Sequence, residues 1–255
     1  AQAMTGKTGI ISTDNTYHGN TMAVSQLSSR KPPIGGYAAN IRHVTAPDTL
    51  RPIGGNTAGQ AEAFAREIQI AIDDLEAAGH GFSGFLFCPT FANEGLPDLP
   101  QNFMKPAAKA IHAAGGILIA DEVQPGFGRS GDTWWGHDWL GLSPDVVTLG
   151  KSMANGHPVA AVVTRAEVMS AFRNAFGYFN TFGGNPVSCA AAAATLDVIE
   201  QDNLLENAKL VGAEFLQNLH GLDHGSIAST RGRGLFIALE LETDGVADEA
   251  LAAHV

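Results

Sequence analysis

Strand-like and helix-like segments alternate along most of the chain. Short apolar runs rich in β-formers occupy 9–13, 84–88, 117–121, 145–150 and 159–164. Segments with helical periodicity follow at 61–81, 102–116, 165–176, 186–202 and 204–221. Several strands are apolar on both faces, which is typical of a sheet buried between helix layers. The sequence therefore predicts an α/β fold with a mostly parallel sheet.

The region 28–60, rich in Pro, Gly and Asn, is predicted to be a long loop. After residue 203 come an amphipathic helix, a strand at 235–242 and a further helix-like start. We expect a large domain over 1–203 and the beginning of a smaller C-terminal α+β domain over 204–255. Because the sequence begins and ends inside helix-like segments, we expect it to be truncated at both ends, with the N-terminal part of the large domain missing.

Charge and composition exclude several classes of partner. The net charge of −11 excludes nucleic acid, since phosphate binding needs a basic surface. No apolar run has transmembrane length, so no membrane partner is expected. Cys88 and Cys189 lie in apolar stretches of sequence and are expected to be reduced core residues of a cytoplasmic protein. Charged residues make up only 16%, so much of the surface is expected to be covered by a partner chain or by missing sequence.

The strand 117–121 ends in two acids, Asp121 and Glu122. An Asp after a strand is often only a helix cap or a turn residue. The carboxyl ends of strands in an open α/β sheet, however, are where ligands bind. The strand 145–150 ends in a glycine, and Lys151 follows it directly.

Lys151 and Asp121 are the expected catalytic pair. A lysine in a dry site is an amine nucleophile that forms a Schiff base with an aldehyde. A carboxylate such as Asp121 holds a protonated pyridine nitrogen, and this pairing is typical of pyridoxal phosphate (PLP) enzymes. Tyr17 offers a face on which the ring can stack. Thr181, followed by two glycines before a helix, suits a phosphate.

A nucleotide-hydrolase interpretation starts from the same residues. The stretch "ILIADE" looks like a Walker B strand, and "GKS" looks like the end of a P-loop. A P-loop requires a glycine where this chain has Asp145, and a glycine loop where it has the strand "VVTL". The Schiff-base interpretation is therefore preferred.

One long stretch and two shorter ones resemble the class III (ω-aminotransferase-like) family of PLP enzymes. They are "ILIADEVQPGFGRSGDTWWGHDWLGLSPDVVTLGKSMANGHPVAAVVT", "TYHGNT" and "NTFGGNPVSCAAAAATLDVIE". The resemblance covers nearly the whole chain. It implies fold-type I, with a large PLP domain and a smaller C-terminal domain, in a homodimer whose active sites lie at the interface.

The resemblance also assigns roles to single residues. Lys151 matches the Schiff-base lysine and Asp121 the partner of the ring nitrogen. Val123 would pack under the ring and Gln124 would approach its 3-hydroxyl. Tyr17 would stack on the ring face, with His18 beside it. Thr181 would reach the cofactor phosphate of the other subunit.

The chain departs from the family pattern in "CPTFANEG", where Cys88 replaces a glutamate. The segment "ANGHP", residues 154–158, follows Lys151 closely. It resembles the segment found in the branch of the family that holds alanine–glyoxylate aminotransferases and phospho-amine phospholyases. The resemblance thus implies transamination between an amino acid or amine and a keto acid or aldehyde. A phospholyase acting on a phosphorylated amine and a non-catalytic PLP-fold fragment are the alternatives.

The remaining polar and aromatic residues are assigned structural roles. Glu122 is expected to cap or form a salt bridge, and Arg129 to lie at an interface or in the cofactor loop. Trp134 and Trp135 are expected in a core or an interface. The histidines show no ligand-like spacing, and no metal site is predicted.

Overall fold

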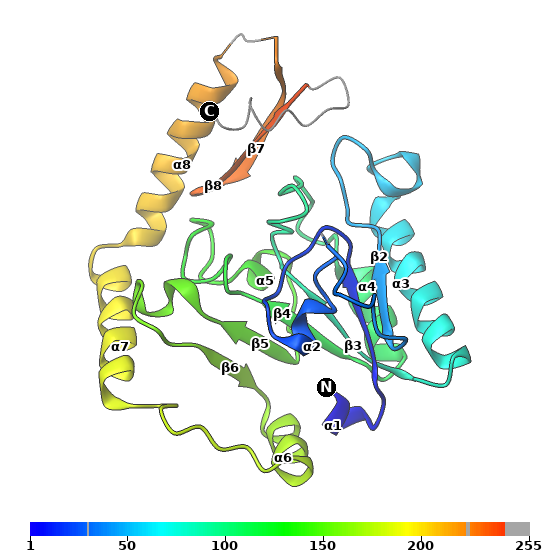
Figure 1. Ribbon diagram of the computed structural model, residues 1–255. Helices are drawn as coiled ribbons and strands as arrows, with labels where there is room; N and C mark the ends of the chain where they lie inside the picture. The colour runs from blue at the N-terminus through cyan, green and yellow to red at the C-terminus, as the bar shows by residue number, and fades with distance from the viewer. Residues whose placement is uncertain (30, 223–224, 243–255) are drawn as a thin grey trace.

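A six-stranded sheet forms the centre of the molecule (Figure 1). The computed structural model describes residues 1–29, 31–222 and 225–242. The strands lie in the order β2-β1-β3-β4-β5-β6, and all neighbours are parallel except β5 and β6. Their bounds are β1 Gly9–Thr13, β2 Ile41–Val44, β3 Phe82–Phe87, β4 Ile117–Asp121, β5 Val146–Leu149 and β6 Ala161–Thr164. The predicted α/β class with a mostly parallel sheet is confirmed.

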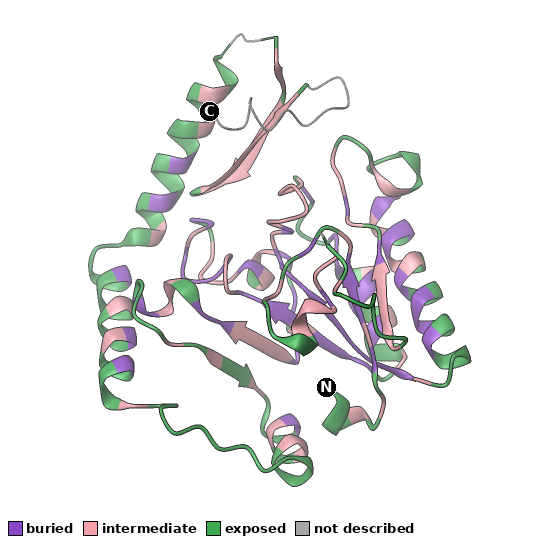
Figure 2. Ribbon diagram, viewed as in Figure 1, coloured by how far each residue is buried: buried purple, intermediate pink, exposed green. Residues whose placement is uncertain are grey.

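Two helices, α3 (Gln60–Ala77) and α4 (Lys105–Ala113), cover one face of this sheet. On α3 the apolar side chains recur at helical spacing, and Phe64, Ile68 and Leu75 are fully buried. Figure 2 shows the resulting buried stripe on the sheet side of α3 and the exposed opposite side. Phe64 makes ring contacts with Phe85 of β3 and with two further phenylalanines. This aromatic core holds the strands in place.

Parallel strands approach closely at Gly84 of β3. A Cβ there would lie 2.7 Å from the carbonyl oxygen of Ile117 on β4. A side chain would therefore push the two strands apart, which explains a glycine within an otherwise apolar strand.

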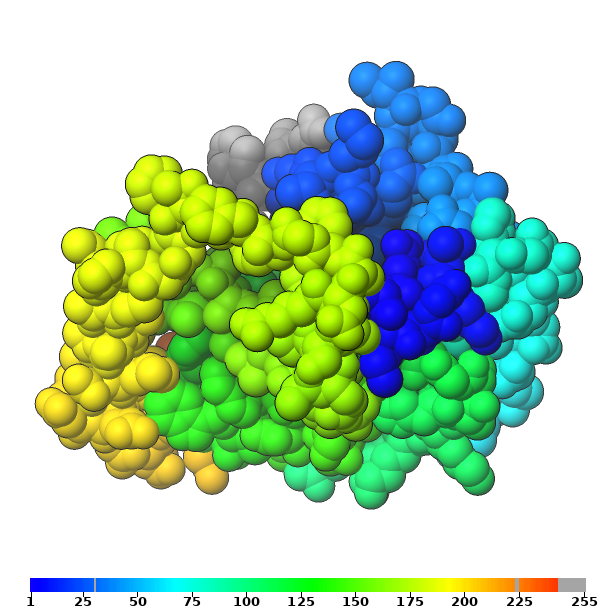
Figure 3. Space-filling model, turned by 90° about the horizontal axis from the view of Figure 1, so that it is seen from below, coloured from blue at the N-terminus to red at the C-terminus, as the bar shows by residue number. Residues whose placement is uncertain are grey.

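The later part of the chain is more open. Helix α6 (Ala166–Ala175) follows β6, and two long helices, α7 (Pro186–Gln201) and α8 (Leu204–His220), run along one side of the molecule. Most residues of α7 and α8 are exposed. Seen from below, the surface is hollowed between α6 and α7, and residues from the middle of the chain lie in the hollow (Figure 3).

A separate antiparallel pair, β7 (Ile227–Arg233) and β8 (Phe236–Leu241), packs beside α8. This hairpin lies above the loops that leave the carboxyl edge of the main sheet (Figure 1). Arg231 donates from Nη2 to the carbonyl of Gly95 at 2.7 Å, and Leu235 N donates to the carbonyl of Arg129 at 3.0 Å. The hairpin is therefore joined to two of these loops.

The short elements are α1 Gln2–Thr5, α2 Met22–Ser25, the 3-10 turn η1 Ile53–Gly55, α5 Gly136–Trp139 and the 3-10 turn η2 Lys151–Ala154. None of the described helices is long and apolar enough to cross a bilayer.

One expectation about secondary structure was wrong, and one strand was not predicted. The region 28–60 is not one loop, because it contains β2 and η1. Ile41–Val44 holds Arg and His at its centre, and only pairing with β1 reveals it as an edge strand. The strand β7, with sequence "IASTRGR", was also missed because it lacks an apolar run. The helix expected after residue 242 lies outside the described residues.

Candidate active site

Four neighbouring parallel strands end at the same edge of the sheet. The residues that follow β1, β3, β4 and β5 therefore meet there, although they lie far apart in sequence. They surround an open cavity of about 210 Å³, which is room for several waters or a small aromatic ring. The lining residues are Tyr17, His18, Gly19, Cys88, Asp121, Val123, Gln124 and Lys151.

Asp121 is buried at the end of β4, and both of its carboxyl oxygens are engaged. Oδ1 accepts from the backbone N–H of Val123 at 3.0 Å and, more weakly, from the Thr148 hydroxyl at 3.5 Å. Oδ2 lies 2.7 Å from Nδ1 of His18. These contacts fix the carboxylate at the floor of the cavity.

His18 is clamped beside this carboxylate. Its side chain is only 2% exposed, and its backbone N–H donates to the Ser28 hydroxyl at 3.1 Å. Its second ring nitrogen, Nε2, lies 3.1 Å from the hydroxyl of Thr16. Because both ring nitrogens have partners, the ring cannot turn without breaking two hydrogen bonds.

Lys151 stands at the end of β5 in an unusual backbone conformation. Its φ angle is +36°, in the left-handed region that non-glycine residues rarely occupy. The side chain is exposed at the cavity. The next residue, Ser152, accepts a hydrogen bond from the Arg129 guanidinium, which also lies over the ring of Phe236. Arg129 thus ties the turn that carries Lys151 to the β7–β8 hairpin.

Tyr17, Val123 and Gln124 complete the walls. Tyr17 is 39% exposed, so a ring face is free to stack on a ligand. An aromatic face, an apolar side chain, a buried carboxylate and an accessible amine together suit a flat basic ring that bears an aldehyde. The donor set therefore fits the PLP inferred from the sequence.

Thr181 does not join this group. It lies in the exposed loop before α7, as do Gly183 and Gly184, and it does not line the cavity. Its neighbour Asn180 accepts from the N–H groups of Phe182 and Gly183, at 3.1 and 2.9 Å. The structure of this chain alone gives Thr181 no role in the cavity.

Sequence reasoning did not place Cys88, Thr13 or Thr16 at the site. Cys88 lines the cavity, and burial raises the pKa of its thiol to about 12, so the thiol stays protonated. Thr13 and Thr16 are fully buried behind His18. Cys88 was visible as a departure from the family pattern, and Thr16 opens the quoted stretch "TYHGNT", but Thr13 carries no signal in the sequence.

Glu122 has a structural role, as expected. It is fully buried and accepts from the backbone N–H groups of Gly136 and His137, at 3.0 and 2.8 Å. The His137 ring is also bonded to it, with Nδ1 2.7 Å from Oε1. Trp134 and Trp135 pack against the small cluster around Phe127, and within the described residues no group of three or more His, Cys, Asp and Glu is placed to hold a metal.

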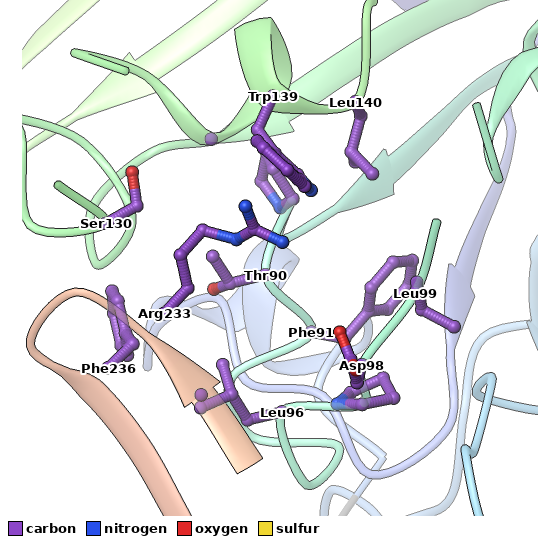
Figure 4. A pocket seen from close by; sticks show the side chains of 14 residues that line it. Thr90, Phe91, Leu96, Asp98, Leu99, Ser130, Trp139, Leu140, Arg233 and Phe236 are labelled. Atoms are coloured by element: carbon purple, nitrogen blue, oxygen red, sulfur yellow. The ribbon is translucent and has the colours of Figure 1, made fainter. Parts of the chain in front are cut away.

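A second cavity lies between the β7–β8 hairpin and the main sheet (Figure 4). Its volume is only about 50 Å³. Arg233 points across it, lies over the Trp139 ring and donates to Asp132 at 3.0 Å. Because the Arg233 cation is already paired and the space is so small, we interpret this cavity as a packing gap between the hairpin and the loops of the main sheet rather than a substrate site.

Comparison with known proteins places this cavity in context. The family described as "Aminotransferase class-III" matches residues 1–255. An alanine–glyoxylate aminotransferase 2-like protein of Drosophila melanogaster is 35% identical, over 96% of this chain and 51% of its own length. An ethanolamine-phosphate phospho-lyase homolog of Caenorhabditis elegans is 32% identical, over 91% of this chain and 53% of its own length.

Among solved structures, a phospholyase from Arthrobacter in complex with phosphoethanolamine is similar. It has a TM-score of 0.88 and 38% identity, over 96% of this chain and 58% of the other. The chain thus spans about half the length of the curated relatives it matches.

Proposed function

The chain belongs to the class III aminotransferase family, and on this premise we propose that the protein containing it is a PLP-dependent aminotransferase. It would move an amino group from an amino acid or amine to a keto acid or aldehyde. The observation that carries the proposal is the meeting of Lys151, Asp121 and Tyr17 at one cavity, from three different strand ends.

Bound PLP supplies an aldehyde for a lysine amine and a pyridine ring that accepts electrons when its nitrogen is protonated. Asp121 would hold the proton of that nitrogen, because a buried carboxylate pairs strongly with a cation. Tyr17 and Val123 would pack on the ring, and Gln124 would bind its 3-hydroxyl. His18 would keep the Asp121 carboxylate in place.

Lys151 would serve as the anchoring amine and, once released, as the base. Its Nζ would take a proton from the substrate α-carbon and return a proton to the cofactor. The left-handed backbone at Lys151 and the contact between Ser152 and Arg129 support this role, since they limit where the amine can point. Strained backbone of this kind is concentrated at functional sites.

A phospholyase is the second candidate. Its specific support is the 38% identity and TM-score of 0.88 to the Arthrobacter phospholyase bound to phosphoethanolamine. Lys151 and Asp121 would play the same parts in it. The reaction would also require a cationic site for the substrate phosphate.

We further propose a homodimer with shared active sites, in which Thr181 binds the cofactor phosphate of the other subunit. The exposed loop around Thr181 supports this, because Phe179 and Phe182 are 84% and 78% exposed in the single chain. We propose a large domain over 1–203 and the beginning of a small domain over 204–255. Both cysteines are free thiols, although only Cys88 is buried and the expectation of a core position was wrong for Cys189, which is exposed. From the free thiols we propose a reducing compartment such as the cytoplasm.

Borohydride reduction of the full-length protein with PLP tests the anchoring residue. Peptide mass spectrometry is expected to find the pyridoxyl group on Lys151, and the label should be lost in Lys151→Ala but kept in the surface control Lys105→Ala. A label on another lysine would overturn the assignment. Amino transfer from alanine to glyoxylate and phosphate release from phosphoethanolamine, measured side by side, then separate the two candidate reactions.

A further inference from the structure

Arg129 connects two parts of the molecule that are far apart in sequence. Its guanidinium donates from Nη2 to the hydroxyl of Ser152, the residue that follows Lys151. The guanidinium carbon lies 5.4 Å from the centre of the Phe236 ring on β8, which is a cation–π contact. The backbone carbonyl of Arg129 accepts from Leu235 N at 3.0 Å. The β7–β8 hairpin therefore holds Arg129 by main chain and side chain, and Arg129 holds the turn that carries the candidate amine.

The support behind Arg129 is a close contact between backbone segments. A Cβ on Gly234, between β7 and β8, would lie 2.6 Å from the carbonyl oxygen of Arg129. A Cβ on Gly212 of α8 would overlap the carbonyl oxygen of Gly234. Backbone thus packs on backbone from α8 through the end of the hairpin to Arg129. Close packing of this kind transmits small shifts, because no side chain at these two contacts can change rotamer to absorb them.

The hydrogen bond from Arg129 has a clear direction. The guanidinium is half-buried and forms no ion pair with the described residues. Arg233 on the same hairpin, by contrast, donates to Asp132 at 3.0 Å. The Ser152 hydroxyl is therefore the acceptor at which the Arg129 cation is aimed, and a hydrogen bond from a charged donor is stronger than one between neutral groups.

The turn after β5 requires a restraint of this kind. Lys151 has a φ angle of +36°, a conformation that is costly for a residue with a Cβ and persists only where the surroundings enforce it. Within the turn, Met153 N donates to the carbonyl of Gly150 at 2.9 Å. Helix α7 also contacts the turn. The bond from Arg129 to Ser152 adds a directional contact from a third part of the chain.

We propose that Arg129 is a positioning residue for the amine of Lys151 and that the β7–β8 hairpin is its support. By holding Ser152, Arg129 stabilises the left-handed backbone from which Lys151 reaches the cavity. Without the guanidinium the turn would relax and the amine would leave the place where an aldehyde has to meet it. The inference rests on the proposed function, because it takes Lys151 as the amine that reacts with PLP. The restraint on the turn itself requires no cofactor.

Hydrogen exchange of cofactor-free, full-length protein tests the restraint. Arg129→Met keeps a side chain of similar length without its donors, and Ser152→Ala removes the acceptor. Both should lose amide protection in the peptide 150–156, because a loosened turn opens more often. Arg233→Met is the matched control, since Arg233 lies on the same hairpin and its described contacts, with Trp139 and Asp132, lie outside the turn. It should keep the wild-type protection of this peptide.

The rate at which PLP captures Lys151 tests the consequence for the amine. Timed borohydride reduction followed by peptide mass spectrometry should show capture about ten- to a hundredfold slower in Arg129→Met, since a misplacement of about 1 Å can cost that much. Ser152→Ala should be slowed to the same degree, and the double variant no further, because both changes remove the same hydrogen bond. In the Lys151→Ala background, Arg129→Met should leave PLP affinity unchanged, because a residue that acts only through Lys151 has nothing left to position.

Wild-type exchange and capture in Arg129→Met, or an equal loss in Arg233→Met, would overturn the proposal. A weaker PLP affinity caused by Arg129→Met in the Lys151→Ala background would also contradict it, because Arg129 would then act on the cofactor directly. If Arg129→Met does not fold, Ser152→Ala alone decides between these outcomes. A wild type that PLP never labels on Lys151 would refute the proposed function, whereas lost protection in both variants would still establish the restraint on the turn.

Discussion

At the scale of single residues, Asp121 is buried and both of its carboxyl oxygens are hydrogen-bonded. Asp121→Asn keeps the shape and removes the charge, and a hydrogen bond to a charged group is worth about 1.5–3 kcal/mol. We expect PLP affinity to fall by roughly ten- to a hundredfold, since each 1.4 kcal/mol is about a factor of ten, and turnover to fall further. Absorbance titration with PLP measures the affinity. The exposed Asp138→Asn serves as control, and wild-type affinity and rate in Asp121→Asn would rule out the assigned role.

Glu94 makes a prediction about stability and pH. Its folded-state pKa lies above its ordinary value of 4.5, so in that range the folded protein binds more protons than the unfolded chain. Its contribution to stability is therefore complete at pH values below 4.5 and is lost as pH rises through the folded pKa. Glu94→Gln lacks this loss.

The melting temperature of Glu94→Gln minus that of the wild type is thus expected to become more positive as pH rises from about 4 to 8. Thermal unfolding monitored by circular dichroism across this range measures it. The exposed Glu62→Gln should show no such trend. A difference that stays level with pH would mean that Glu94 ionises in the folded protein as it does in water.

At the scale of elements, the packing of α3 on the sheet is the main contact of the core. Phe64 is fully buried among Phe85, Phe91 and Phe103, and its removal leaves a cavity that these rings cannot fill. Phe64→Ala is expected to cost about 3–5 kcal/mol. Ile70 on the same helix is 67% exposed, and Ile70→Ala should change stability by less than about 0.5 kcal/mol. Urea unfolding of both variants gives the comparison, and equal losses would contradict this picture of the core.

Elements with a strong local signal were predictable from the sequence. The strand expected at 117–121 is β4 with the same bounds, and the helix expected at 186–202 is α7, which ends one residue earlier. Asn185 begins that helix by accepting from Ser188 N, and Pro186 occupies its first turn. β2 carried no such signal, because an edge strand takes its conformation from the neighbour with which it pairs.

At the scale of the whole molecule, some residues of the candidate site could be predicted from local sequence and others could not. Asp121 and Lys151 could be placed at one edge from sequence, because the ends of parallel strands converge and both follow strands directly. Glu94 could not be linked to Thr13, since these residues are 81 positions apart and meet only when β1 and β3 pair. Contacts set by tertiary structure leave no local pattern to read.

The segment before α7 exposes apolar side chains that a second copy of the chain could cover. Phe176, Tyr178, Phe179 and Phe182 are all more than half exposed, an unusual density of aromatic side chains for a solvated loop. Thr181 lies among them and does not reach the cavity of its own chain. A second copy that covers this loop would bury the aromatic side chains and would bring Thr181 to the partner's cavity.

Mixing two inactive full-length variants tests this arrangement. Lys151→Ala removes the anchoring amine, and Thr181→Asp places a negative charge where a phosphate would bind. If Thr181 acts across the interface, the mixed dimer carries both lesions in one site and has the other site intact, so about half of the activity per mixed dimer should return. Thr181→Asp mixed with Thr181→Asp that bears a purification tag controls for subunit exchange. Exchange without any recovery would place Thr181 in the site of its own chain, because each site of the mixed dimer would then hold one lesion.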